Sequence, residues 1–162
     1  MVQNIQFTPN FSLYELLVTE HRSFDEEQYN PPSAVIDNLK ALCINILQPL
    51  RDALGTPVKV NSGYRCPSLN KAIKGSLTSQ HMTGQAADII DLTNGNEYLF
   101  KKIKELNLPF DQMIDEFGFR WVHVSYDPAR NRRDILQAVK DAKGKTIYVR
   151  PNVQTPGNCL NE

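Results

Sequence analysis

Two histidines and one aspartate in this chain are of the types and spacing that could bind a metal ion. His81 precedes Asp88 by seven residues, with small residues between them that suit a tight turn, and His123 follows in the segment Trp-Val-His-Val-Ser. Two imidazoles and one carboxylate are a common set for a catalytic Zn²⁺, because they leave the fourth tetrahedral position open. On spacing alone, ordinary packed histidines remain an alternative, since short motifs of this kind often arise without a metal.

Three blocks of the sequence resemble the M15 group of zinc peptidases, the D-Ala-D-Ala carboxypeptidase-like peptidoglycan hydrolases. The blocks are residues 62–65 (Ser-Gly-Tyr-Arg), residues 79–88 (Ser-Gln-His-Met-Thr-Gly-Gln-Ala-Ala-Asp) and residues 110–125, from Phe-Asp-Gln through His-Val-Ser. They occur in the order found in that family. The resemblance implies that His81, Asp88 and His123 are the metal ligands and that the metal is Zn²⁺.

The resemblance also assigns roles to Arg65 and Ser79. In the family an arginine after Ser-Gly-Tyr binds the carbonyl or carboxylate region of the substrate, and a guanidinium could stabilise an oxyanion through two parallel hydrogen bonds. We therefore expect Arg65 to be both catalytic and substrate-binding, with a surface salt bridge as the alternative. Ser79, two residues before His81, either contacts substrate or ties down its own loop.

The general base departs from the family pattern. Several relatives carry an acid three residues before the last ligand, but this chain has Arg120 there, which cannot act as a base. The nearest carboxylates are Asp115 and Glu116, and successive strand residues point to opposite faces, so at most one should face the metal. If the chain folds back as a hairpin, Glu116 lies across from the His123 strand. We take Glu116 as the base, with a structural ion pair to a nearby arginine as the alternative.

The composition narrows the class of protein. The chain has 162 residues, of which 41% are hydrophobic and 22% are charged, which suits one globular domain with a real core. Its 18 basic and 18 acidic residues argue against a nucleic-acid binder. The basic run at residues 130–133 is expected to be a solvated turn. Cys43, Cys66 and Cys159 are too few for a disulfide framework, and no apolar run is long enough to span a membrane.

Periodicity predicts the elements that must position these residues. Residues 1–10 look irregular, and Ser12 with Glu15 forms a capping-box pattern for a short helix to about residue 19. A long helix should begin at residue 33 and be kinked or ended locally at Pro49. Further elements are expected at residues 58–62, 86–90, 112–116, 121–126 and 145–149 as strands, and at residues 68–74 and about 96–106 as helices. Residues 133–142 fit either a helix or a short edge strand.

This order of elements favours an α+β fold with a mainly antiparallel sheet and helices packed on one side. The resemblance implies the same architecture, the hedgehog/DD-peptidase-like fold. We expect residues 1–150 to form a single M15-like peptidase domain and residues 151–162 to form a loosely ordered tail.

The resemblance implies a zinc metallopeptidase that hydrolyses a peptide bond in peptidoglycan stem peptides, as a carboxypeptidase or an endopeptidase. Two other functions stay open: a non-hydrolytic zinc-binding module of the cell-wall-binding or phage structural kind, and a metal-free interaction domain. No signal peptide is visible near Met1, so we expect the chain to be cytoplasmic as synthesised and to reach the cell wall by lysis or another route. The scissile bond and the oligomeric state do not follow from the sequence.

Overall fold

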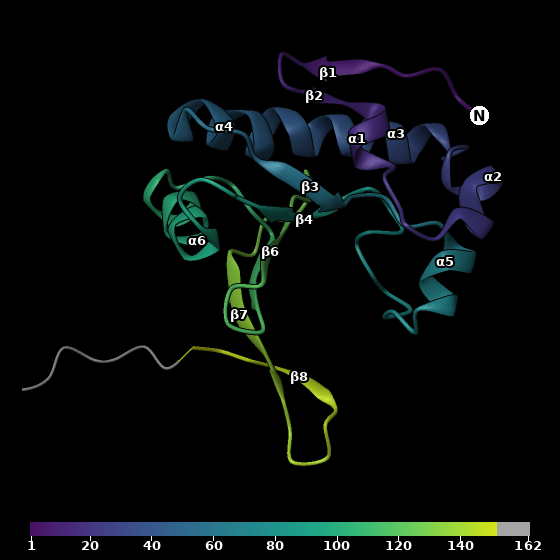
Figure 1. Cartoon of the computed structure of the whole chain (residues 1–162). Helices are drawn as coiled ribbons and strands as arrows, with labels where there is room; N and C mark the ends of the chain where they lie inside the picture. The colour runs from purple at the N-terminus through teal and green to yellow at the C-terminus, as the bar shows by residue number, and fades with distance from the viewer. Residues whose placement is uncertain (152–162) are drawn as a thin grey trace, which may run out of the picture.

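A computed structural model of the chain describes residues 1–151. It has an α+β architecture, in which a six-stranded sheet packs against helices from the N-terminal half, as predicted (Figure 1). Of the expected tail at residues 151–162, residues 152–162 lie outside the described residues. Within residues 1–151, no helix combines the length and the apolar character needed to cross a membrane.

The N-terminal residues are more ordered than the sequence suggested. The predicted irregular lead-in is wrong, because β1 (Gln6–Thr8) pairs with β2 (Phe11–Ser12) in a small antiparallel hairpin. The capping box is confirmed: Glu15 Oε2 accepts a hydrogen bond from the Ser12 amide at 2.8 Å. The helix that it starts, α1 (Leu13–Leu16), is shorter than expected. A 3₁₀ turn, η1 (Arg22–Phe24), and α2 (Asp25–Gln28) follow.

The predicted long helix is present as three consecutive segments. They are α3 (Ser33–Leu42), a π-helical turn η2 (Cys43–Leu47) and α4 (Gln48–Leu54). The π turn stands where Pro49 would disturb an α-helix, because its ring clashes with the carbonyl four residues earlier and it has no N–H to donate. Pro49 therefore distorts the helix locally without ending it, and the apolar face continues unbroken on both sides of the turn.

The main sheet has the strand order β3-β4-β6-β5-β7-β8. Its strands are β3 (Lys59–Ser62), β4 (Ala86–Ile90), β5 (Gln112–Glu116), β6 (Trp121–Ser125), β7 (Asp134–Lys140) and β8 (Thr146–Val149). The helices α5 (Pro67–Ala72) and α6 (Asn96–Glu105) connect them. All neighbouring strands are antiparallel except β5 and β7.

The ambiguous segment at residues 133–142 is therefore a strand, but it is not at the edge. It pairs with β5 on one side and β8 on the other. The helical alternative is wrong because this segment is held by pairing with a strand on each side, which the local apolar pattern does not indicate.

The two faces of the sheet have different tasks. One face carries apolar side chains that are buried against the helices, namely Val60, Ala87, Ile89, Met113, Val122 and Val124. The alternate residues on the same strands, which point the other way, include Asp88, Glu116 and His123. The core thus fixes the strands from one side and leaves the predicted site residues together on the other.

Candidate metal centre

Three side-chain atoms converge on the polar face of the sheet. Asp88 Oδ1 lies 3.0 Å from His123 Nδ1 and 3.3 Å from His81 Nε2. The two imidazole nitrogens lie 3.2 Å apart. The histidines are almost fully buried, at 4% and 8% exposure. Among residues 1–151, these three side chains form the group of His, Cys, Asp and Glu that could hold a metal ion.

The backbone brings the three residues together from two strands and a loop. Asp88 on β4 stands directly opposite His123 on β6, so their side chains share one face. His81 belongs to the loop before β4, which turns at Gly84 with a positive φ of 71°. A Cβ on Gly84 would lie 2.6 Å from the Val35 carbonyl oxygen, so only glycine allows this loop to pack on α3.

The orientation of the His81 ring is fixed by a second contact. Its Nδ1 lies 2.7 Å from the Gly63 carbonyl oxygen, which can only accept a hydrogen bond, so Nδ1 carries the proton and Nε2 is free as a ligand. Gly63 is held in turn because the Tyr64 amide donates to the Leu16 carbonyl at 2.7 Å, and a Cβ on Gly63 would collide with that carbonyl. Buried backbone therefore supports the first ligand.

The geometry fits a tetrahedral zinc ion. Zinc bonds to imidazole and carboxylate are about 2.0–2.1 Å long, and the edge of a tetrahedron with such bonds is about 3.3 Å. The three separations between the donor atoms are 3.0, 3.2 and 3.3 Å. Two nitrogens and one oxygen also suit zinc chemically. Three charged or polar groups this close and this buried would otherwise have to share protons among themselves.

The charge state of Asp88 agrees with a ligand. Burial alone would raise its pKa, but the nearby imidazoles of His81 and His123 outweigh that effect and lower the pKa well below its usual range. Asp88 is therefore ionised at neutral pH, as a carboxylate ligand must be.

Arg65 lies at the edge of the cluster. Its Nη2 is 3.6 Å from Asp88 Oδ2 and 3.4 Å from the Ser62 Oγ, and the Arg65 side chain is only 15% exposed. The Arg65 amide also donates to the His81 carbonyl at 3.1 Å. The partner of Arg65 is thus a carboxylate of the candidate metal site, which distinguishes this contact from an ordinary surface salt bridge.

Ser79 lies in the turn that leads into His81. Its amide donates to the Ser76 carbonyl at 3.2 Å, and its carbonyl accepts from the Met82 amide at 3.0 Å. These contacts agree with a loop-stabilising role for its backbone, and the role of its side chain stays a prediction.

The two candidate bases point to opposite faces of β5. Glu116 pairs with Trp121 and lies diagonally across from His123, where side chains are about 7–8 Å apart at most. Asp115 faces the core side and accepts hydrogen bonds from the Phe119 amide and from Gln137 Nε2. Asp115 is therefore held in structural contacts, and Glu116 is the carboxylate on the face of the metal ligands.

Glu116 is 7% exposed and forms no ion pair within residues 1–151. Burial raises its pKa to about 7; the nearby imidazole of His123 opposes this, and the negative charges of Asp88 and Asp115 add to it. Arg120, at the position where several relatives carry the acid, is exposed in the turn between β5 and β6. It does not occupy the face that Glu116 occupies.

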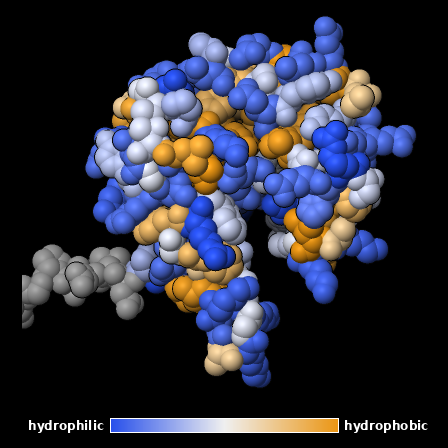
Figure 2. Space-filling model, viewed as in Figure 1, coloured by the Kyte–Doolittle hydropathy of each residue, from blue (hydrophilic) through white to orange (hydrophobic). Residues whose placement is uncertain are grey.

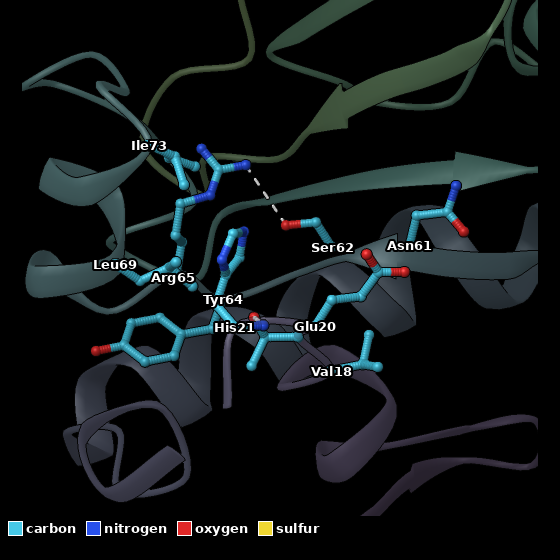
Figure 3. A pocket seen from close by; sticks show the side chains of 10 residues that line it. Val18, Glu20, His21, Asn61, Ser62, Tyr64, Arg65, Leu69 and Ile73 are labelled. Carbon is cyan, nitrogen blue, oxygen red and sulfur yellow. Dashed lines mark hydrogen bonds between the residues drawn. The ribbon is translucent and has the colours of Figure 1, made fainter. Parts of the chain in front are cut away.

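A pocket of about 180 Å³ adjoins the centre beside Arg65 (Figure 3). One side is formed by residues 18–21, which follow α1, and the other by β3 and α5. In Figure 3 the guanidinium of Arg65 points towards Ser62, and a dashed line marks the hydrogen bond between them. His21, the third histidine of the chain, lines this pocket and not the metal centre.

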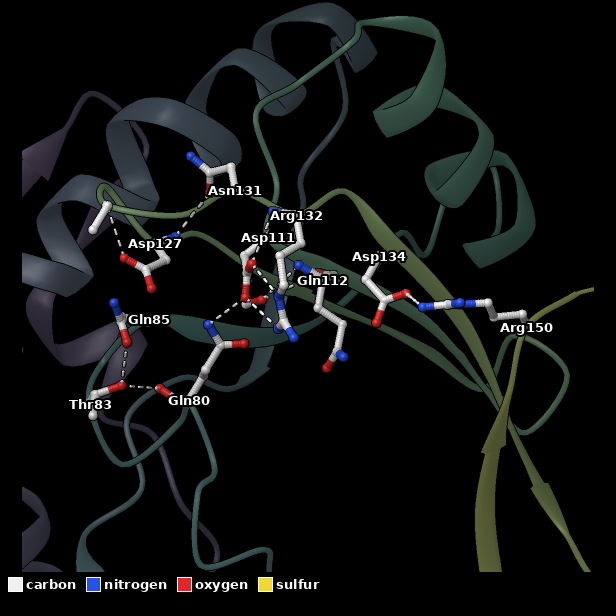
Figure 4. A network of polar contacts seen from close by, with 12 residues as sticks. Gln80, Thr83, Gln85, Asp111, Gln112, Asp127, Asn131, Arg132, Asp134 and Arg150 are labelled. Carbon is white, nitrogen blue, oxygen red and sulfur yellow. Dashed lines mark hydrogen bonds and ion pairs between the residues drawn. The ribbon is translucent and has the colours of Figure 1, made fainter.

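An ion pair between exposed Arg132 and buried Asp111, which the sequence did not predict, anchors the loop of His81 (Figure 4). Asp111 is fully buried and accepts hydrogen bonds from Arg132 Nε and Nη2, both at 2.7 Å, and from Gln80 Nε2 at 3.0 Å. Arg132 is exposed, as expected for residues 130–133, but it also forms an ion pair that the sequence did not predict. The signal was available in the carboxylate that directly precedes β5, but its partner lies 21 residues away.

Comparison with known proteins identifies a family. The family model described as Peptidase M15 matches residues 9–125, which is more than half of the chain. The matched part contains the three metal-site residues, Arg65 and Glu116, and it ends before β7 and β8. No curated protein sequence is similar enough to count as a match.

Proposed function

This chain belongs to the peptidase M15 family, and we propose that it is a zinc-dependent peptidase that hydrolyses a peptide bond in peptidoglycan stem peptides. The observation that carries the proposal is the convergence of His81 Nε2, Asp88 Oδ1 and His123 Nδ1 within 3.3 Å of one another. Two neutral imidazoles and one carboxylate leave room for water and substrate at a zinc ion.

In this proposal His81, Asp88 and His123 hold the metal. A zinc ion bound there would polarise the carbonyl of the scissile bond and lower the pKa of water, which are the two effects that amide hydrolysis needs. The hydrogen bond from His81 Nδ1 to the Gly63 carbonyl keeps the first ligand in its productive tautomer.

Glu116 acts as the general base. Its carboxylate accepts a proton from the attacking water and returns it to the leaving amine. Two features support this role: its place on the ligand face of β5, and a pKa raised to about 7, close to the pH at which a group can both accept and donate a proton. The exposed Arg120 has no part in this step.

Arg65 steadies the substrate. Its guanidinium is held beside Asp88 and Ser62, so its remaining N–H groups can bind a carboxylate or a developing oxyanion with paired hydrogen bonds. A non-hydrolytic zinc-binding module would need the same ligands but no base. The placement of Glu116 therefore favours the peptidase over that alternative.

The test uses two defined substrates and one method of product detection. Zinc-loaded protein is incubated with a stem pentapeptide that ends in D-Ala-D-Ala and, separately, with a cross-linked stem dimer, and the products are identified by mass spectrometry. We expect loss of a terminal residue from the first or separation of the second, and no product from chelator-treated protein. Zinc-loaded protein that cleaves neither substrate would contradict the proposal.

A further inference from the structure

The hairpin of β7 and β8 is an addition to the part of the chain that matches the family. The match ends at residue 125, whereas the hairpin covers residues 134–149. Figure 2 shows the molecule hollowed between the part that carries α5 and the part that carries this hairpin. The loop that carries His81 follows α5, so the hollow is bounded by a ligand-bearing segment on one side and by the hairpin on the other.

The register of the sheet places one hairpin side chain in line with the proposed base. Glu116 on β5 pairs with Ala138 on β7, and Ala138 pairs with Tyr148 on β8. Residues paired in this way project from the same face. Tyr148 therefore stands on the face of Glu116 and His123, two strands beyond Glu116.

Burial indicates that the side chains of this row shield one another from solvent. Ala138 is fully buried although its strand lies next to the edge of the sheet, and Glu116 is only 7% exposed. The methyl group of Ala138 is too small to cover the carboxylate of Glu116 alone, and the next side chain in the row is the phenol of Tyr148. We attribute part of the shielding of Glu116 to this ring. Tyr148 itself is 54% exposed, so much of the ring stays open to solvent on this face of the sheet.

The charged groups that act on Tyr148 belong to the candidate metal centre and its surroundings. Burial together with the negative charges of Glu116 and Asp88 raises the pKa of Tyr148, and Arg65 opposes this. The same proximity works in the other direction, because Tyr148 is among the groups that act on the pKa of Arg65. The phenol therefore keeps its proton at neutral pH, and its hydroxyl forms no hydrogen bond with another side chain in residues 1–151. It is a free donor.

We propose that the β7–β8 hairpin is a wall of the substrate cleft and that Tyr148 is its substrate-contacting residue, donating a hydrogen bond to a backbone carbonyl oxygen of the bound peptide. This inference rests on the proposed peptidase function. It adds a specificity element that lies outside the matched part of the chain. A peptide bound between Arg65 and Tyr148 would be contacted on both sides of the three candidate metal ligands.

The test compares Tyr148→Phe, which removes only the hydroxyl, with two controls. Ile147→Ala changes the neighbouring residue on the opposite face of β8, and Tyr98→Phe removes an exposed hydroxyl on α6. Turnover of the stem peptide gives kcat and KM. Affinity for the uncleaved peptide is measured by calorimetry and by the fluorescence of Trp121, the single tryptophan, in zinc-loaded Glu116→Gln protein with and without Tyr148→Phe.

We expect Tyr148→Phe to lower kcat/KM and the affinity each about tenfold, the scale of one lost neutral hydrogen bond, with zinc content and thermal midpoint unchanged. Both controls should match the wild type. If the wild type binds and cleaves the peptide and Tyr148→Phe does so equally well, the role of Tyr148 is overturned while the peptidase stands. If the wild type neither binds nor cleaves, both proposals fall.

Discussion

Two rows of side chains cross the same face of the sheet, and they differ in how their polar atoms are satisfied. The first row contains Ser62, Asp88 and His123, which are joined to Arg65 and His81 by contacts of 3.0–3.6 Å. The second row contains Glu116, Ala138 and Tyr148. Within residues 1–151, the side chains of this second row make no hydrogen bond or ion pair with other side chains.

The difference indicates a division of labour. In the proposed function, the groups that hold the metal are fixed by their neighbours, whereas the groups that exchange protons or hydrogen bonds with a substrate keep their polar atoms free. Glu116 shows the consequence most clearly, because a buried carboxylate without a partner has a pKa raised to about 7. Substitutions at His123, Glu116 and Arg65 can test whether the two rows are separable.

The largest expected effect concerns the ligand row. His123→Ala removes one of three protein ligands, so zinc affinity should fall at least about 100-fold, since disturbing only a supporting contact already costs 10–100-fold. Zinc content after dialysis, measured by elemental analysis, should drop from about one ion per chain to a small fraction. His21→Ala is the matched control, and equal zinc content in both variants would remove His123 from the site.

Glu116→Gln should abolish the proton-accepting function of the second row and leave the first row intact. The amide keeps the shape of the side chain but cannot accept the proton, so kcat should fall by about 10²–10⁴-fold while zinc content stays at the wild-type level. Steady-state kinetics on a stem peptide gives the first quantity and elemental analysis the second. Asp115→Asn, on the opposite face of β5, is the control. A crippled Asp115→Asn beside an active Glu116→Gln would mean that the base has been assigned to the wrong face.

Arg65→Lys should have an intermediate effect, because Arg65 borders both rows. Lysine keeps the positive charge beside Asp88 but loses the planar pair of donors, so we expect kcat/KM to fall about 10- to 100-fold with zinc retained. Arg120→Lys at the exposed turn should leave the kinetics unchanged. Wild-type kinetics for Arg65→Lys and Arg65→Ala together would place Arg65 among residues of purely structural importance.

The smallest effect is on stability and its dependence on pH. Burial would raise the pKa of Asp111, but the hydrogen bonds from Arg132 and Gln80 outweigh it and lower that pKa. The stabilisation is therefore complete above the pKa of the unfolded state and is lost as the pH falls through the folded pKa.

Asp111→Asn should thus cost about 1–3 kcal/mol near neutral pH and less in acid. Urea unfolding at pH 6 and at pH 3 measures both. A variant whose deficit is the same at the two pH values would show that the charge of Asp111 contributes nothing.

The sequence predicted the first row better than the second, and the reason is physical. His81 and Asp88 lie in one short segment whose glycine and alanines specify its turn, and the strand at residues 86–90 was predicted with its observed bounds. Local signals also placed the helix start at Ser33 and the β5–β6 hairpin that puts Glu116 on the face of His123.

The second row depends on pairing between strands that are distant in sequence. β7 and β8 form a local hairpin, but nothing near Tyr148 indicates that β7 runs parallel to β5, because pairing between strands this far apart in sequence is set by the whole sheet. The same holds for Arg132, which is exposed as its basic neighbours suggested, but whose contact with buried Asp111 has no local signal. Long-range partners therefore account for most of what the sequence did not reveal.

The central claim is that His81, Asp88 and His123 hold a zinc ion, and X-ray absorption at the zinc edge of the loaded protein tests it most directly. The account predicts two imidazoles and otherwise oxygen ligands at about 2.0–2.2 Å, with no sulfur. The His123→Ala protein should lose one imidazole or the metal itself. A sulfur ligand at about 2.3 Å, or fewer than two imidazoles in the wild type, would contradict the assignment.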